Sequence, residues 1–238
     1  MMRKNSSLIG VLACCVIIAA CSIVTGNRTA EQWLELLQAG VVAEDNFRFS
    51  GTVVMGFEDG LALTPFAFNG EIEEHKQIAL HAEQSSSLVH NPVNEIEFIA
   101  QHYKEAEITH NGLDEAHASN IVVLQVQVDE KAATERWKEL LKQELSNVGL
   151  EALTSAKEQN KHLALVQQEI DRSQRELEEM LNKLNVEMQV ELTIDPSRIV
   201  PLQMNENITM KYVKDGMDIH EFRKSNIKFD LSPDEVVR

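Results

Sequence analysis

One cysteine in this chain stands where its thiol would be chemically modified. Residues 8–20 form an apolar run preceded by Arg3 and Lys4, which is the order of a secretory signal peptide. The run ends in Ile18-Ala19-Ala20-Cys21, the pattern of a bacterial lipobox. We therefore expect cleavage before Cys21 and a diacylglycerol-derived group on its sulfur, with palmitate among the acyl chains. The alternative is an ordinary signal peptide that is cleaved elsewhere.

This modification would set the location of the mature protein. A membrane-spanning helix needs about 20 apolar residues, so the run at 8–20 is too short to be one. The lipid on Cys21 would then hold the chain at the outer face of the cell membrane, through a tether at 21–29. Removing the two positive charges of the signal peptide takes the net charge from −16 to −18. Such a charge repels nucleic acid, which we exclude as a partner.

The remaining reactive residue types do not form a catalytic pattern. None of the eight histidines belongs to a zinc-binding motif, and the mature chain keeps one cysteine, the acylated one. The chain has no Gly-x-Ser-x-Gly elbow and no glycine-rich phosphate loop. Carboxylates at 169–179 alternate with Arg172 and Arg175 as on a solvated helix. We therefore expect no catalytic residue, no metal and no cofactor, and a protein that is not an enzyme.

Two-residue alternation of apolar and polar side chains predicts most of the structure before residue 129. A helix should begin after Thr29, a plausible N-cap, and residues 85–95 should form a loop. Strands are expected at 47–57, 66–72, 78–82, 95–100 (weakly), 105–109 and 121–128.

A block at 129–184 changes to helical composition, rich in Ala, Leu, Glu, Lys and Gln. Asp129 should cap it and Gly149 should break it. Its second half carries apolar residues at steps of three and four from Leu163 to Leu184. This seam indicates either a coiled coil or a helix packed on the protein's own sheet, and the latter is the simpler interpretation.

Strands return after the block, at 188–194 and beyond 200. Pro201 should restrict the next strand to a sheet edge or a bulge. Asp215-Gly216 lies between alternating runs and predicts a hairpin. Residues 232–238 should be a polar tail.

The order of these elements predicts an α+β fold, in which a strongly curved antiparallel sheet forms an incomplete barrel with helices on its concave face. We expect one domain over 30–231. Its inner face should gather apolar side chains that are candidates to line a ligand site: Phe47, Phe49, Val53, Met55, Phe66, Phe68, Leu80, Met188, Val190 and Met210. The alternative is that these residues fill an ordinary core.

The chain also resembles a known family. The features that carry this resemblance are the lipobox, the start of the first strand at 47–51, the helical block, and the segment at 192–204 with the Tyr-x-x-Asp-Gly hairpin that follows it. With these features the chain is similar to the LolA/LppX-like lipoproteins, particularly uncharacterised exported lipoproteins of Gram-positive bacteria. The resemblance implies a half-barrel whose interior holds acyl chains or whose surface senses a partner. Thr193 stands where the family often has tryptophan.

These observations predict a membrane-anchored, non-enzymatic binder of a lipid or another amphiphile. The alternative is a cell-surface interaction or sensing module that docks a protein through its helical block or a sheet edge.

Overall fold

A computed structural model describes residues 28–44, 46–58, 60–73, 77–82, 91–112, 121–158 and 163–230. The predicted signal peptide, Cys21, most of the predicted tether and the predicted polar tail lie outside these residues. For 73 and 77–82 only the backbone is described.

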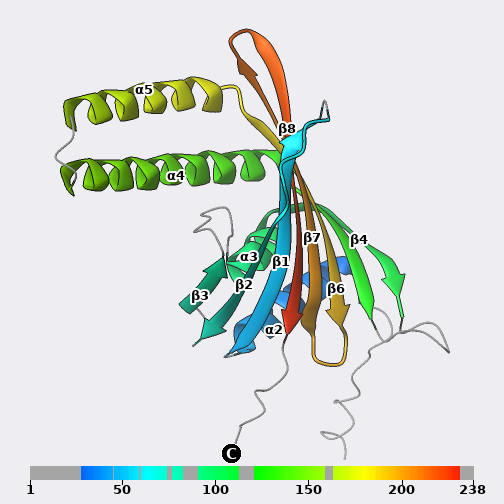
Figure 1. The fold of residues 1–238 in the computed structure, drawn as a ribbon. Coiled ribbons are helices and arrows are strands. Elements are labelled where there is room, and N and C mark those ends of the chain that lie inside the picture. Colours follow the sequence, from blue (N-terminus) through cyan, green and yellow to red (C-terminus); the bar gives the residue numbers. More distant parts are fainter. Residues whose placement is uncertain are drawn as a thin grey trace, which may run out of the picture.

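One open antiparallel sheet is the centre of the fold. Its strand order is β3-β2-β1-β8-β7-β6-β5-β4, so the two edge strands stay apart and the described sheet does not close into a barrel. Figure 1 shows the strands converging at one end and spreading around the helices at the other. The eight strands are β1 (Phe47–Phe57), β2 (Phe66–Glu73), β3 (Gln77–Ala82), β4 (Tyr103–Asn111), β5 (Val122–Val128), β6 (Asn185–Asp195), β7 (Val200–Lys214) and β8 (Met217–Asp230).

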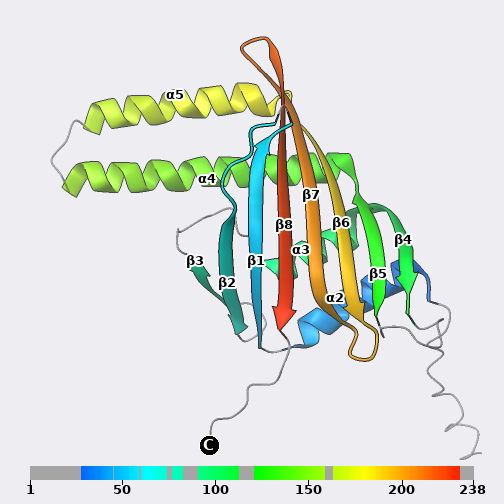
Figure 2. The same ribbon diagram turned by 45° about the vertical axis from the view of Figure 1, so that its right-hand side comes forward.

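The helices lie on one side of this sheet. Figure 2 shows α2, α3 and part of α4 behind the strands, whereas the far part of α4 and most of α5 project away from them. The α+β half-barrel architecture with helices on the inner face is confirmed. The four described helices are α2 (Ala30–Ala43), α3 (Pro92–His102), α4 (Glu130–Glu158) and α5 (Leu163–Leu181).

Local sequence signals place most of these elements correctly. Thr29 caps α2 in a reciprocal capping box with Gln32, and Asp129 accepts a hydrogen bond from the Ala132 amide at the start of α4. The turn between β7 and β8 has positive φ at both Asp215 and Gly216, as a two-residue hairpin requires. The predicted bulge at Pro201 is also present, as a register shift opposite Ile194. However, β7 lies inside the sheet and not at an edge.

The predicted weak strand at 95–100 is wrong, because this segment belongs to helix α3. Asn91 caps the helix by accepting a hydrogen bond from the Val93 amide, and Pro92 occupies its first turn. Ile96 and Ile99 are buried one helical turn apart. The Asn-Pro start signal and this spacing outweigh the local strand propensity of the segment.

The helical block forms a two-helix arm rather than a cover for the sheet. Ala133 and Trp137 in the first turns of α4 are buried, and the Thr134 hydroxyl accepts a hydrogen bond from the Val186 amide of β6. Beyond this attachment, α4 and α5 pack on each other. The predicted break at Gly149 is wrong, because α4 continues through it with Ile170 of α5 packed close against its Cα.

The C-terminal part of α2 packs on the tight turn between β6 and β7. Ile199 in this turn has a φ of 59°, a strained value for a β-branched residue. Its amide donates to the Asp195 carbonyl, and Arg198 forms an ion pair with Glu44 just after α2. A Cβ at Gly40 would lie 2.0 Å from the Ile199 carbonyl oxygen, so this contact requires glycine.

Gly40→Ala should therefore destabilise the protein by about 1–3 kcal/mol, even though alanine favours a helix by about 1 kcal/mol. Gly149→Ala is the matched control, because its Cβ would meet only the movable Ile170 side chain at 3.3 Å. We expect that change to be neutral or stabilising. Urea unfolding of both variants measures the difference. Equal stability of Gly40→Ala and the parent chain would contradict the packing described here.

Candidate functional site

The predicted ligand-lining residues share the inner face of the sheet. Seven of the ten are buried in the main core, whereas Met55 and Phe66 are partly buried against it, and the side chain of Leu80 is not among those described. Trp33 and Leu37 of α2 and Ile99 of α3 belong to the same core. The described inner side chains thus pack together, and their role toward a ligand stays a prediction. The seven buried residues are Phe47, Phe49, Val53, Phe68, Met188, Val190 and Met210.

Charged side chains interrupt this apolar face near its centre. Glu206 of β7 and Arg223 of β8 form an ion pair of 3.0 Å, with side chains only 4% and 3% exposed. The Ser225 hydroxyl donates a hydrogen bond to the same carboxylate oxygen of Glu206. All three residues occupy inward positions of strands whose neighbouring inward positions are apolar, such as Met204 and Ile227.

A second buried pair comes from the helices. Arg136 of α4 donates a hydrogen bond of 2.6 Å to Glu95 of α3. The Arg136 guanidinium lies 4.1 Å from the centre of the Phe98 ring, and Arg223 lies 5.8 Å from the centre of the Trp137 ring. These aromatic faces favour the cations where water is excluded. We call Glu95, Arg136, Glu206 and Arg223 the inner charge cluster.

Electrostatic coupling joins the two pairs. Burial and, next, the negative charge of Glu206 raise the pKa of Glu95 to about 7, although Arg136 and Arg223 oppose the rise. Glu95 thus changes its charge near neutral pH, and the inner charge cluster gains net positive charge when Glu95 takes up a proton.

The pH dependence of stability tests this environment. The ordinary pKa of the carboxyl is 4.5 and the folded one is about 7, so between these values the folded state holds an extra proton. The contribution of Glu95 to stability is therefore fully present below pH 4.5 and is lost as the pH rises through 7. Glu95→Gln should remove this loss, which is on the order of 3 kcal/mol.

Urea unfolding between about pH 5 and about pH 8 gives the two curves to compare. Glu97→Gln, at an exposed position of the same helix, controls for the loss of one acidic side chain. Parallel curves for the Glu95→Gln variant and the parent chain would contradict the raised pKa.

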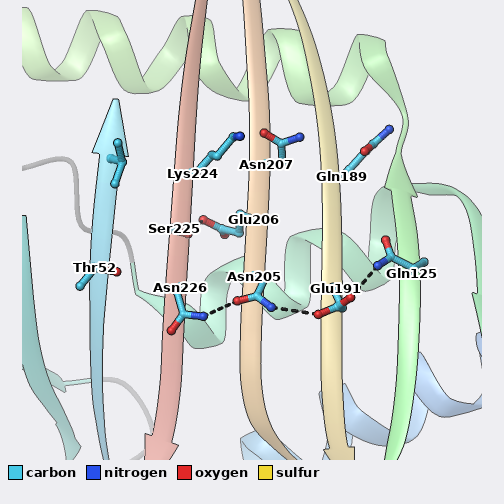
Figure 3. A pocket seen from close by; sticks show the side chains of 11 residues that line it. Thr52, Gln125, Gln189, Glu191, Asn205, Glu206, Asn207, Lys224, Ser225 and Asn226 are labelled. Carbon is cyan, nitrogen blue, oxygen red and sulfur yellow. Dashed lines mark hydrogen bonds between the residues drawn. The ribbon is translucent and has the colours of Figure 1, made fainter. Parts of the chain in front are cut away.

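The opposite face of the sheet is polar and carries a depression of about 540 Å³. Figure 3 looks onto this face, with the helices behind the strands. A smaller depression of about 210 Å³, lined by residues of β4, β5 and β6, lies beside it. The larger one is lined by Thr52, Val54, Gln125, Gln189, Glu191, Asn205, Glu206, Asn207, Lys224, Ser225 and Asn226.

Side chains of four neighbouring strands form a hydrogen-bonded ladder across this depression. Asn226 donates to Asn205, and Asn205 donates to one oxygen of Glu191 at 2.9 Å. Gln125 donates to the other oxygen of Glu191 at 2.8 Å. The ladder holds its carboxamide groups in fixed orientations across the strands.

The described residues also bear on the metal and membrane predictions. Within this part of the chain no three His, Cys, Asp or Glu side chains come close enough to hold a metal ion. None of the helices over the described ranges has both the length and the apolar character needed to cross a bilayer. Six of the eight histidines lie between residues 75 and 117, and of these six only His102 and His110 have described side chains.

Neither polar feature was predicted from the sequence. Glu206 and Arg223 stand at positions of β7 and β8 where alternation calls for apolar residues, and this interruption was a usable signal. The outer ladder gave a weaker signal, because polar residues on the outer side of a strand are ordinary. Its alignment depends on the register of four strands.

Comparisons with known proteins add little about the family or the fold of this chain. No protein-family model matches the chain, and no curated protein matches it. The crystal structure of a LolA superfamily protein from Nitrosomonas europaea aligns with 89% of this chain and 98% of its own length. The sequence identity is 10% and the TM-score is 0.29, so the likeness is loose. The fold described above therefore stands on its own strand order and register.

Proposed function

We propose that this protein is an exported lipoprotein, anchored through Cys21, that binds a lipid or another amphiphile between its sheet and its helices. The role is non-enzymatic. The observation that supports it is the inner charge cluster, which lies within an apolar interior formed by an open sheet and helices α2 and α3. An amphiphile would match this site, because its apolar chain suits the apolar interior and its polar head suits the inner charge cluster.

The cost of burying charges favours a functional explanation of the cluster. Ion pairs in an apolar interior lose their hydration, and apolar side chains of similar volume are often equally stabilising or better. The two pairs of the inner charge cluster therefore add little that a wholly apolar core would lack. A head group with polar or charged atoms would give these side chains a role. Because the described inner side chains pack together, uptake requires α2 or α3 to move from the sheet.

The arm formed by α4 and α5 supports the second candidate, a module that docks a protein. Much of the arm stands clear of the sheet, and there α5 packs on α4; near the end of α5, Leu177 and Met180 pack against the main core. Large apolar side chains remain exposed on the arm: Val148, Leu150, Leu163 and Leu165. These residues would contact a protein partner at the cell surface.

Uptake of a fluorescent fatty acid by the chain lacking residues 1–21 tests the leading proposal. Glu206→Met/Arg223→Met removes the central ion pair and replaces it with apolar side chains, a change that folded proteins often tolerate. We expect this variant to bind the fatty acid at least about tenfold more weakly, because the charged partner of the head group is lost.

The matched control changes two polar residues on the outer face. Gln189→Ala/Asn207→Ala alters a directly paired position of β6 and β7 and should leave uptake unchanged. No uptake by the parent chain, or equal uptake by the Glu206→Met/Arg223→Met variant, would rule out binding at the inner charge cluster. Loss of uptake after changes to Leu150 and Leu165 alone would favour the arm.

A further inference from the structure

The depression on the outer face borders the inner site at Glu206 and Ser225, but its other lining residues have a different chemistry. Its side chains come from β1, β8, β7, β6 and β5, and five of them are carboxamides: Gln125, Gln189, Asn205, Asn207 and Asn226. Each carboxamide offers both a hydrogen-bond donor and an acceptor. Lys224 and Glu191 are the charged lining residues at outward strand positions, one of each sign, and Val54 adds an apolar surface. Glu206 also lines the depression, but it stands at an inward position and is paired with Arg223.

Strand register aligns these side chains into two rows that run across the strands. The first row joins Thr52, Asn226, Asn205, Glu191 and Gln125, each directly opposite the next. The second row joins Val54, Lys224, Asn207 and Gln189 in the same way, and continues to Gln127 of the smaller depression. Successive members of a row are therefore separated by the spacing between strands, about 4.8 Å.

The two rows differ in what they can offer a ligand. The first row is bonded to itself through the ladder, which holds its groups in place. In the second row the carboxamides of Gln189 and Asn207 are exposed and make no hydrogen bond to the described residues. The first row is therefore held in place by its own hydrogen bonds, and the second row beside it offers hydrogen-bond donors and acceptors to a ligand.

We propose that this depression binds a neutral, linear carbohydrate chain that lies across the strands, with about one sugar ring per strand. Hydroxyl groups both donate and accept, as carboxamides do, and the balanced charges of Lys224 and Glu191 favour a neutral ligand. One pyranose ring has about the length of the strand spacing. An extended peptide advances about 3.3 Å per residue and would lose register with the members of a row, which are about 4.8 Å apart. Val54 can contact the C–H face of a sugar ring.

The test uses the full chain purified in an amine oxide detergent, which has no sugar head group. Calorimetric titration compares a β-1,4-linked glucose tetramer with the dimer. We expect the tetramer to bind at least about fivefold more tightly, because it reaches more strands. Gln189→Ala/Asn207→Ala should weaken tetramer binding by at least about fivefold, since it removes two hydrogen-bonding groups.

The matched control is Gln168→Ala/Gln174→Ala, which removes two exposed carboxamides from α5 and should leave tetramer binding within about twofold of the parent chain. All four substituted positions are exposed, so we expect both variants to keep the parent melting temperature. No binding of the tetramer, equal binding of dimer and tetramer, or binding unaffected by Gln189→Ala/Asn207→Ala would overturn the proposal. Binding of pentaglycine in place of the tetramer would overturn it in favour of a peptide ligand.

Discussion

One face of the open sheet is apolar and must be covered, whereas the other is polar and can stay in water. The rest of the structure follows from this difference. In β6, β7 and β8 successive side chains alternate between an inner apolar face and an outer polar face. The inner face must be removed from water, and α2, α3 and the start of α4 cover it. This arrangement then encloses the inner charge cluster, in which Glu95 pairs with Arg136 and Glu206 pairs with Arg223, and aromatic faces lie near both cations.

The sequence predicted those parts of the fold that depend on local patterns. Alternation identified the strands at 47–57 and 121–128, and Asp215-Gly216 identified the hairpin between β7 and β8. The start of α3 was missed although Asn91-Pro92 marks it, because the following residues suit a strand as well as a helix. Pro201 was correctly linked to a bulge, but no local signal shows that β7 lies inside the sheet.

The candidate sites depend on contacts that a local pattern does not contain. Glu95 and Arg136 meet only because α3 and α4 cross on the same side of the sheet, and Glu95 then lies near Glu206 from β7. The outer ladder depends on the register of four strands. The seam of α5 could face either the sheet or another helix, and the packed structure shows both: α5 packs on α4, and its C-terminal residues Leu177 and Met180 pack against the core. Periodicity identifies a face of an element but not its partner.

An acyl chain that enters between the sheet and the helices, as we propose, would lie against the inner-face side chains. Methyl NMR spectra of the chain lacking residues 1–21, recorded with a fatty acid that carries a nitroxide on its chain, test this most directly. The account predicts strong broadening of the Met188, Val190 and Met204 methyl signals of the inner face. It also predicts little effect on Leu150 and Leu165 of the arm. Broadening confined to the arm leucines, with sharp inner-face signals, would contradict the account.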